Sequence, residues 1–205
     1  MASMTSPAGT SVHLVDDLRR CVERYTGAKA GIQDLVAGLT DAQFNERPQP
    51  NYWSVAECLD HLVVIGSQTV PKLRDGIRRA EEKGWRKPGP YRYGWVGNYF
   101  VKLTGPTDDA RKRKFKAPKQ YTPSSNHSIS RIVKAFSGLQ DELIETAVLA
   151  NGVDLGRVKV PSPVTNLLKL SLGQWLTLLA GHQERHFLQA KDVRAAIEGG
   201  ASPQS

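Results

Sequence analysis

Apolar residues recur at helical spacing in four separate stretches of this 205-residue chain. The stretches cover about residues 12–39, 54–83, 128–151 and 172–197. Within each, apolar positions three or four residues apart fall on one face of an α-helix, as in helices that pack around a common core. No alternating pattern typical of a strand extends beyond four or five positions. We therefore predict an all-α fold built from four long helices.

The start of the second helix has the clearest local signal. Ser54 and Glu57 have the spacing of a capping box, and Trp53 precedes them where a hydrophobic staple would lie. Pro71 falls inside the same helix and is predicted to bend it, because proline removes a backbone donor and clashes with the preceding turn. The second helix is thus expected to begin at Val55.

The connection between the second and third helices, residues 84–125, has no helical periodicity. It contains five prolines and five glycines, so an irregular insertion is expected, with one short helix through Trp95 to Leu103. We expect residues 12–198 to form one domain around this insertion. Residues 1–11 are expected to be a disordered lead-in, and residues 199–205 a loose tail.

Positive charge is concentrated in the middle of the chain. The net charge is +8, and residues 72–119 alone carry fifteen Lys and Arg against five Asp and Glu. The run from Arg111 to Lys119, with Phe115 and Tyr121 interleaved, is compatible with binding of nucleic acid through phosphate charge and base stacking. Charge runs are more often solvated loops, so a nucleic-acid partner is not our preferred interpretation.

Several features indicate a reduced, cytoplasmic protein. No run of eighteen apolar residues is long enough for a membrane-spanning helix, and the N-terminus does not have the pattern of a secretory signal. Cys21 and Cys58 both lie in apolar helical stretches, where a free cysteine acts as a small hydrophobic residue. We expect no association with membrane.

Three histidines lie on apolar helix faces and are the candidate metal ligands. His182 and His186 are four residues apart, so their rings lie one above the other on the fourth helix. His61 lies on the apolar side of the second helix. Unpaired buried ring nitrogens cost a few kcal/mol each, which a shared divalent ion would avoid. The alternative is ordinary core histidines bonded to carbonyls. His13 and His127 are expected at the surface or in caps.

Two further residues are weak catalytic candidates. Glu57, one turn before His61, has the spacing of a helix cap, or else would be a fourth ligand or a base. Arg185 lies between His182 and His186 and is expected at an exposed position, or would orient the site from outside the ligand set. Glu184 points away from His182 on a helical wheel and is expected to be solvated.

Two motifs carry a resemblance to a known family. Trp-Ser-x-x-Glu-x-x-x-His-Leu at 53–62 and His-x-x-Arg-His-x-x-Gln at 182–189 resemble the DinB superfamily, in its DinB-like or YfiT-like branch of metal-dependent enzymes. The stretches at 39–48 and 170–176 are similar to the same family. The resemblance implies a four-helix bundle with up-down-down-up connections, and it makes His61, His182 and His186 the ligands of nickel, zinc, iron or manganese.

The resemblance also implies a class of activity. Relatives in that family include transferases and isomerases that use a low-molecular-weight thiol, so we expect a metal-dependent transferase or hydrolase acting on a small-molecule substrate. Basic residues of the insertion would suit an anionic substrate. The alternatives are a non-enzymatic metal-binding bundle and a nucleic-acid- or anion-binding bundle. A homodimer is compatible with such a fold, although no residue specifies it.

Overall fold

The chain is mostly helical, which confirms the predicted all-α fold class. The structure, a computed structural model, describes residues 13–106, 118–165 and 167–199. The short elements are α2 (Asp41–Asn45), α4 (Trp95–Thr104), the 3₁₀ helix η1 (Lys119–Tyr121), β1 (Lys159–Pro161) and β2 (Lys169–Ser171). The long helices are α1 (Asp16–Val36), α3 (Val55–Glu82), α6 (Ile129–Leu149) and α7 (Leu172–Gly199).

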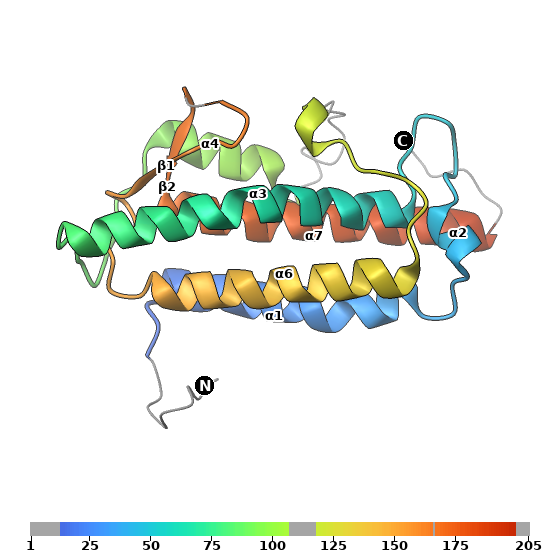
Figure 1. Cartoon of the computed structure of the whole chain (residues 1–205), viewed down its shortest axis with the longest axis horizontal. Helices are drawn as coiled ribbons and strands as arrows, with labels where there is room; N and C mark the ends of the chain where they lie inside the picture. The colour runs from blue at the N-terminus through green and yellow to red at the C-terminus, as the bar shows by residue number, and fades with distance from the viewer. Residues whose placement is uncertain (1–12, 107–117, 166, 200–205) are drawn as a thin grey trace.

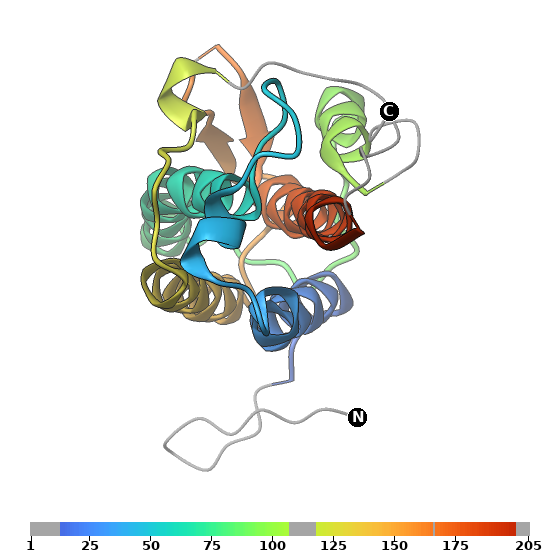
Figure 2. The same ribbon diagram turned by 90° about the vertical axis from the view of Figure 1, so that its right-hand side faces the viewer.

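Each long helix packs against two others (Figures 1 and 2). Both α1 and α3 contact α6 on one side and α7 on the other. The Tyr25 hydroxyl, fully buried on α1, donates to the Leu176 carbonyl of α7 at 2.6 Å. Gly66 of α3 allows close approach to α6, because a Cβ there would lie 2.4 Å from Leu139 Cδ1. The apolar faces that the sequence pattern identifies therefore line a shared core.

The start of α3 follows the predicted capping chemistry. Ser54 Oγ accepts from the Glu57 N–H at 3.1 Å, and Glu57 Oε2 accepts from the Ser54 N–H at 2.9 Å. These bonds satisfy two backbone donors that the first turn of a helix leaves open. The helix continues through Pro71 to Glu82. His61 thus lies about two turns into one uninterrupted helix.

A small two-stranded sheet lies between α6 and α7, where the sequence predicted no strand. β1 and β2 pair antiparallel, with Val160 opposite Leu170, and both of these side chains are buried. The Trp175 indole N–H of α7 donates to the Val160 carbonyl at 2.9 Å. Strands of three residues are too short to show an alternating pattern, so sequence periodicity could not predict this pair.

The segment just before α6 packs against the core, although its composition suggested a solvated basic loop. Tyr121 is only 8% exposed and belongs to the core, so its ring is not available to stack on a base. The basic residues 111–117, the lead-in 1–11 and residues 200–205 lie outside the described parts of the chain. Among the helices that the structure describes, none is long and apolar enough to cross a membrane.

Candidate metal centre

Three imidazoles from two helices converge. The spacing predicted the pair on the fourth helix, and the family resemblance added His61 to it. His61 comes from α3, and His182 and His186 come from α7. One ring nitrogen of each lies within 4.8 Å of the others. The ring centroids of His182 and His186 are 4.5 Å apart, and those of His61 and His186 are 4.7 Å apart. This group can bind a metal ion.

The pair on α7 has the spacing of two ligands on one ion. Nε2 of His182 lies 3.2 Å from Nε2 of His186. That separation is short enough for both nitrogens to bind one ion with metal–nitrogen bonds of about 2.0–2.1 Å. Nδ1 of His186 is buried and has no hydrogen-bond partner among the described residues. The two Nε2 atoms are therefore close enough to share one ion.

The third imidazole is fixed by a backbone carbonyl. Nδ1 of His61 lies 2.6 Å from the Tyr121 oxygen, which can only accept, so we assign the proton to Nδ1. Nε2 of His61 then carries the free lone pair that a metal ligand needs. A hydrogen bond on the far nitrogen is the usual way in which proteins orient metal-binding histidines. Tyr121 was not predicted as part of the metal centre, because a backbone carbonyl has no side-chain signature.

Burial keeps all three imidazoles in the form that binds metal. It lowers the pKa of His61 despite the opposing hydrogen bond to Tyr121. It also lowers the pKa of His182 to about 3, although that residue keeps some solvent contact, with further contributions from His61 and Arg185. The pKa of His186 is well below its usual value, first because of burial and then because of its neighbours. Neutral imidazole is the metal-binding form, so no proton has to leave near pH 7.

Trp53 covers one side of this histidine group. Its ring centroid lies 4.7 Å from that of His61 and 5.7 Å from that of His186, with the second pair stacked. The sequence placed Trp53 before a helix cap, and the structure adds this contact with two of the three rings. An indole wall against the histidines restricts the directions from which water or substrate can approach.

Glu57 acts at the helix cap and lies outside the histidine group. Its buried carboxylate accepts from Arg47 Nε at 2.8 Å and from Ser125 Oγ at 2.7 Å, besides the Ser54 N–H. Burial raises the pKa of Glu57, but these hydrogen bonds outweigh it and leave the pKa below the usual value. The carboxylate is therefore ionised and fully engaged, which favours the capping interpretation over that of a ligand or base.

Arg185 is half-buried, contrary to the exposed position expected for it. One of its guanidinium nitrogens lies 3.4 Å from the Leu103 carbonyl, and burial lowers its pKa. Its charge contributes to the lowered pKa values of His182 and His186. Glu184, expected to be solvated and not a ligand, is partly exposed, accepts from Arg24 Nε at 2.5 Å and is not in the histidine group. A cation thus lies beside the candidate metal centre.

The prediction of a surface or capping role for His127 was wrong, since this residue is buried. Its Nε2 lies 3.0 Å from the Ser124 carbonyl and 3.5 Å from Asp60 Oδ2. These contacts give the buried ring polar partners, which explains how it can be buried without belonging to the histidine group. Sequence spacing gave no sign of this cluster.

Both cysteines are free and buried, as expected. Burial raises the pKa of Cys21 to about 11, and it also raises the pKa of Cys58. A thiol with a raised pKa is a weak nucleophile and a weak metal ligand near pH 7. Neither cysteine belongs to the histidine group in the described chain.

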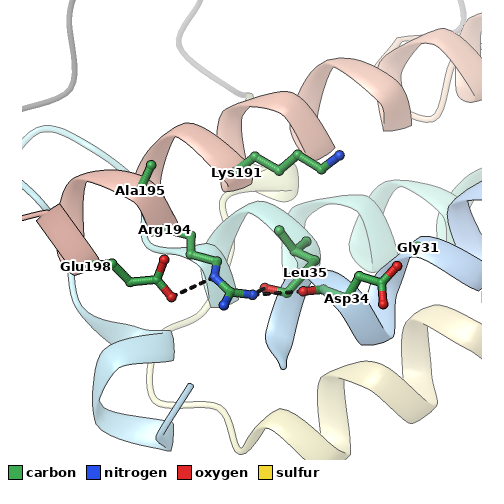
Figure 3. A pocket seen from close by; sticks show the side chains of 7 residues that line it. All are labelled: Gly31, Asp34, Leu35, Lys191, Arg194, Ala195 and Glu198. Carbon is green, nitrogen blue, oxygen red and sulfur yellow. Dashed lines mark hydrogen bonds and ion pairs between the residues drawn. The ribbon is translucent and has the colours of Figure 1, made fainter. Parts of the chain in front are cut away.

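Two clefts lie apart from the histidines. One, of about 230 Å³, lies between the C-terminal parts of α1 and α7, where Arg194 donates to the Asp34 and Leu35 carbonyls and pairs with Glu198 (Figure 3). Arg194 thereby caps the end of α1, a structural role. The second cleft, of about 420 Å³, is lined by residues of α1, α4 and α7, including Asp17 and Gln174.

Fold and site together define a helical protein with a buried three-histidine candidate metal centre. The family model of the DinB superfamily matches residues 24–190, and the chain belongs to that superfamily. It is similar to the uncharacterized protein YuaE of Bacillus subtilis (strain 168), with 26% identity over 177 residues, or 85% of this chain and 97% of that protein. No solved structure matches.

Proposed function

We propose that the chain is a metal-dependent enzyme whose divalent ion is held by His61, His182 and His186. The observation that carries this proposal is the convergence of three neutral imidazoles from two helices, with one ring already oriented by the Tyr121 carbonyl. Three protein ligands leave at least one position for water or substrate, which is typical of catalytic rather than structural sites. Nickel, zinc and iron suit imidazole ligands, and manganese is the further ion that the family resemblance implies.

The predicted topology supports the same site. We propose that α1, α3, α6 and α7 form the up-down-down-up bundle of the family, with the segment between α3 and α6 as the insertion. Val15 bonds to Asn151 and Lys29 pairs with Asp141, which agrees with α1 running opposite to α6. Tyr25 bonds to Leu176 and Leu35 to Arg194, which agrees with α1 running parallel to α7. This arrangement brings the middle of α7 to the N-terminal half of α3, where His61 lies.

The reaction that we propose is a thiol-dependent transfer or a hydrolysis. A bound divalent ion lowers the pKa of a coordinating thiol or water, which supplies a nucleophile near neutral pH. The chain's own groups hold the ion, and Trp53 restricts access to it. Arg185, half-buried beside two of the ligands, suits an anionic group of a small-molecule substrate.

Metal analysis of protein purified without a histidine tag tests the proposed site. We expect one divalent ion per chain in the wild type, and its loss in His182→Ala, because two remaining ligands hold an ion poorly. His13→Ala is the matched control, since His13 is exposed and outside the group. Equal metal content in wild type and His182→Ala would rule out the site.

The choice between thiol and water is tested on the cobalt-substituted protein. Direct coordination of a low-molecular-weight thiol should add sulfur-to-cobalt charge-transfer absorption, which His182→Ala should lack. Absence of that absorption at saturating thiol, together with cleavage of a model ester, would favour the hydrolase. Absence of both signals would leave a non-enzymatic metal-binding protein as the better description.

A further inference from the structure

Residues 120–127, called the strap below, lie along α3 beside the candidate metal centre. The strap begins within η1, the short yellow-green helix in Figure 1, and passes over α3 before the chain enters α6. Its first contact with the centre is the Tyr121 carbonyl, 2.6 Å from Nδ1 of His61. The orientation of one candidate ligand therefore depends on where the strap lies.

Polar side chains on one face of α3 hold the strap at successive points. Gln68 Nε2 donates to the Gln120 carbonyl at 3.2 Å, on one side of Tyr121. On the other side, Glu57 Oε1 accepts from Ser125 Oγ at 2.7 Å. Gln68, at the middle of α3, meets the beginning of the strap, and Glu57, at the start of α3, meets its end, so the two segments run antiparallel.

The attachment that follows Tyr121 most closely along the chain is made by Asp60. Its buried Oδ2 accepts from the Ser124 N–H at 2.8 Å and from Ser124 Oγ at 3.1 Å. Nε2 of His127 lies 3.0 Å from the Ser124 carbonyl, so the backbone of Ser124 is held on both of its polar groups. A carboxylate that accepts two bonds from one residue fixes that residue more firmly than either bond alone.

We propose that Asp60 is a positioning residue for His61. By holding Ser124, it keeps the Tyr121 carbonyl, three residues away, on Nδ1 of His61 and so maintains the tautomer with Nε2 free for a metal ion. This inference rests on the metal site proposed above. Outer partners of metal-binding histidines commonly act in this way, by fixing ring orientation and tautomer.

The metal-binding test compares Asp60→Ala, Asp60→Asn and wild type by competition for Co²⁺. Asp60→Ala should weaken the affinity for Co²⁺ about tenfold. This is the lower end of the effects seen when a residue that supports a metal ligand is removed, because Gln68 and the buried Tyr121 ring still hold the strap. Asp60→Asn should recover part of the loss, since its amide oxygen still accepts from the Ser124 N–H. Asp154→Ala is the control, because Asp154 also accepts two loop N–H bonds but lies outside the strap and the histidine group.

A second measurement is independent of metal. In metal-free protein, nitrogen-15 NMR of the imidazoles should show His61 with its proton on Nδ1, and Asp60→Ala should shift the population towards the Nε2 tautomer. A merely structural role for Asp60 would lower thermal stability without moving this population. If Asp60→Ala does not fold, Ser124→Ala, at an exposed position, should give a smaller effect of the same sign in both measurements.

The outcomes separate the two proposals. If the wild type binds Co²⁺, and Asp60→Ala has the same affinity and the same His61 tautomer, only the positioning role is overturned. A wild type that binds no ion overturns the proposed function, and this inference with it.

Discussion

At the scale of single residues, two buried glutamines differ in whether their amides have partners. Gln174 is bonded to Ser171, to the Gly94 carbonyl and to Asn98. Gln140, which is fully buried on α6, has no partner for either amide atom among the described residues. A buried polar group without a hydrogen bond costs about 1–3 kcal/mol, whereas a satisfied one contributes favourably. A buried glutamine is therefore expected to lower the free energy of unfolding at position 140 and to raise it at position 174.

We therefore expect opposite effects from the same substitution. Gln140→Met keeps a similar volume and removes an unsatisfied amide, so it should raise the free energy of unfolding by about 1 kcal/mol. Gln174→Met should lower it by about 1–3 kcal/mol, because it leaves partner groups unpaired. Urea denaturation of both variants checks this. A destabilised Gln140→Met would show that the amide is satisfied, for instance by buried water.

At the scale of elements, two helical glycines separate packing from helix propensity. A Cβ on Gly66 of α3 would meet three atoms of the Leu139 side chain, the nearest at 2.4 Å, inside the contact with α6. A Cβ on Gly138 of α6 would have no atom within 4 Å. Alanine favours a helix over glycine by about 1 kcal/mol, while overpacking a core costs about 1–3 kcal/mol.

Gly138→Ala should therefore stabilise the protein by up to about 1 kcal/mol, and Gly66→Ala should destabilise it, since Leu139 is buried and must move as a whole. Thermal unfolding of the two variants beside wild type measures the difference. Equal stabilisation in both would mean that α3 and α6 are too far apart for a Cβ at position 66 to clash with Leu139.

The elements also show what sequence could and could not predict. Long helices follow from local periodicity, and the start of α3 follows from Ser54 and Glu57, so the main elements were predictable. The two histidines of α7 were predictable as a pair from their spacing alone. The Tyr121 carbonyl, the burial of His127 and the pairing of β1 with β2 depend on contacts between distant segments. Such contacts involve backbone groups or very short elements, which leave no pattern in the sequence.

At the scale of the whole molecule, the candidate ion would join two helices that are far apart in sequence. His61 and His182 are separated by the whole of the insertion and α6, so the unfolded chain does not hold the three imidazoles together. An ion that binds only the folded state stabilises it by about 2.7 kcal/mol at a free concentration one hundred times its dissociation constant. For a chain of this size, each kcal/mol raises the midpoint of unfolding by roughly 2–4 °C.

Saturation of metal-free protein with its divalent ion should therefore raise the midpoint by roughly 5–10 °C, and a chelator should reverse the shift. His61→Ala and His182→Ala should each lose most of this shift, because each removes a ligand from a different helix, while His13→Ala should keep it. Calorimetry with and without metal checks all four proteins. A shift that survives in both ligand variants would place the bound ion elsewhere on the chain. A shift lost only in His182→Ala would mean that α7 alone holds the ion, which then does not connect the two helices.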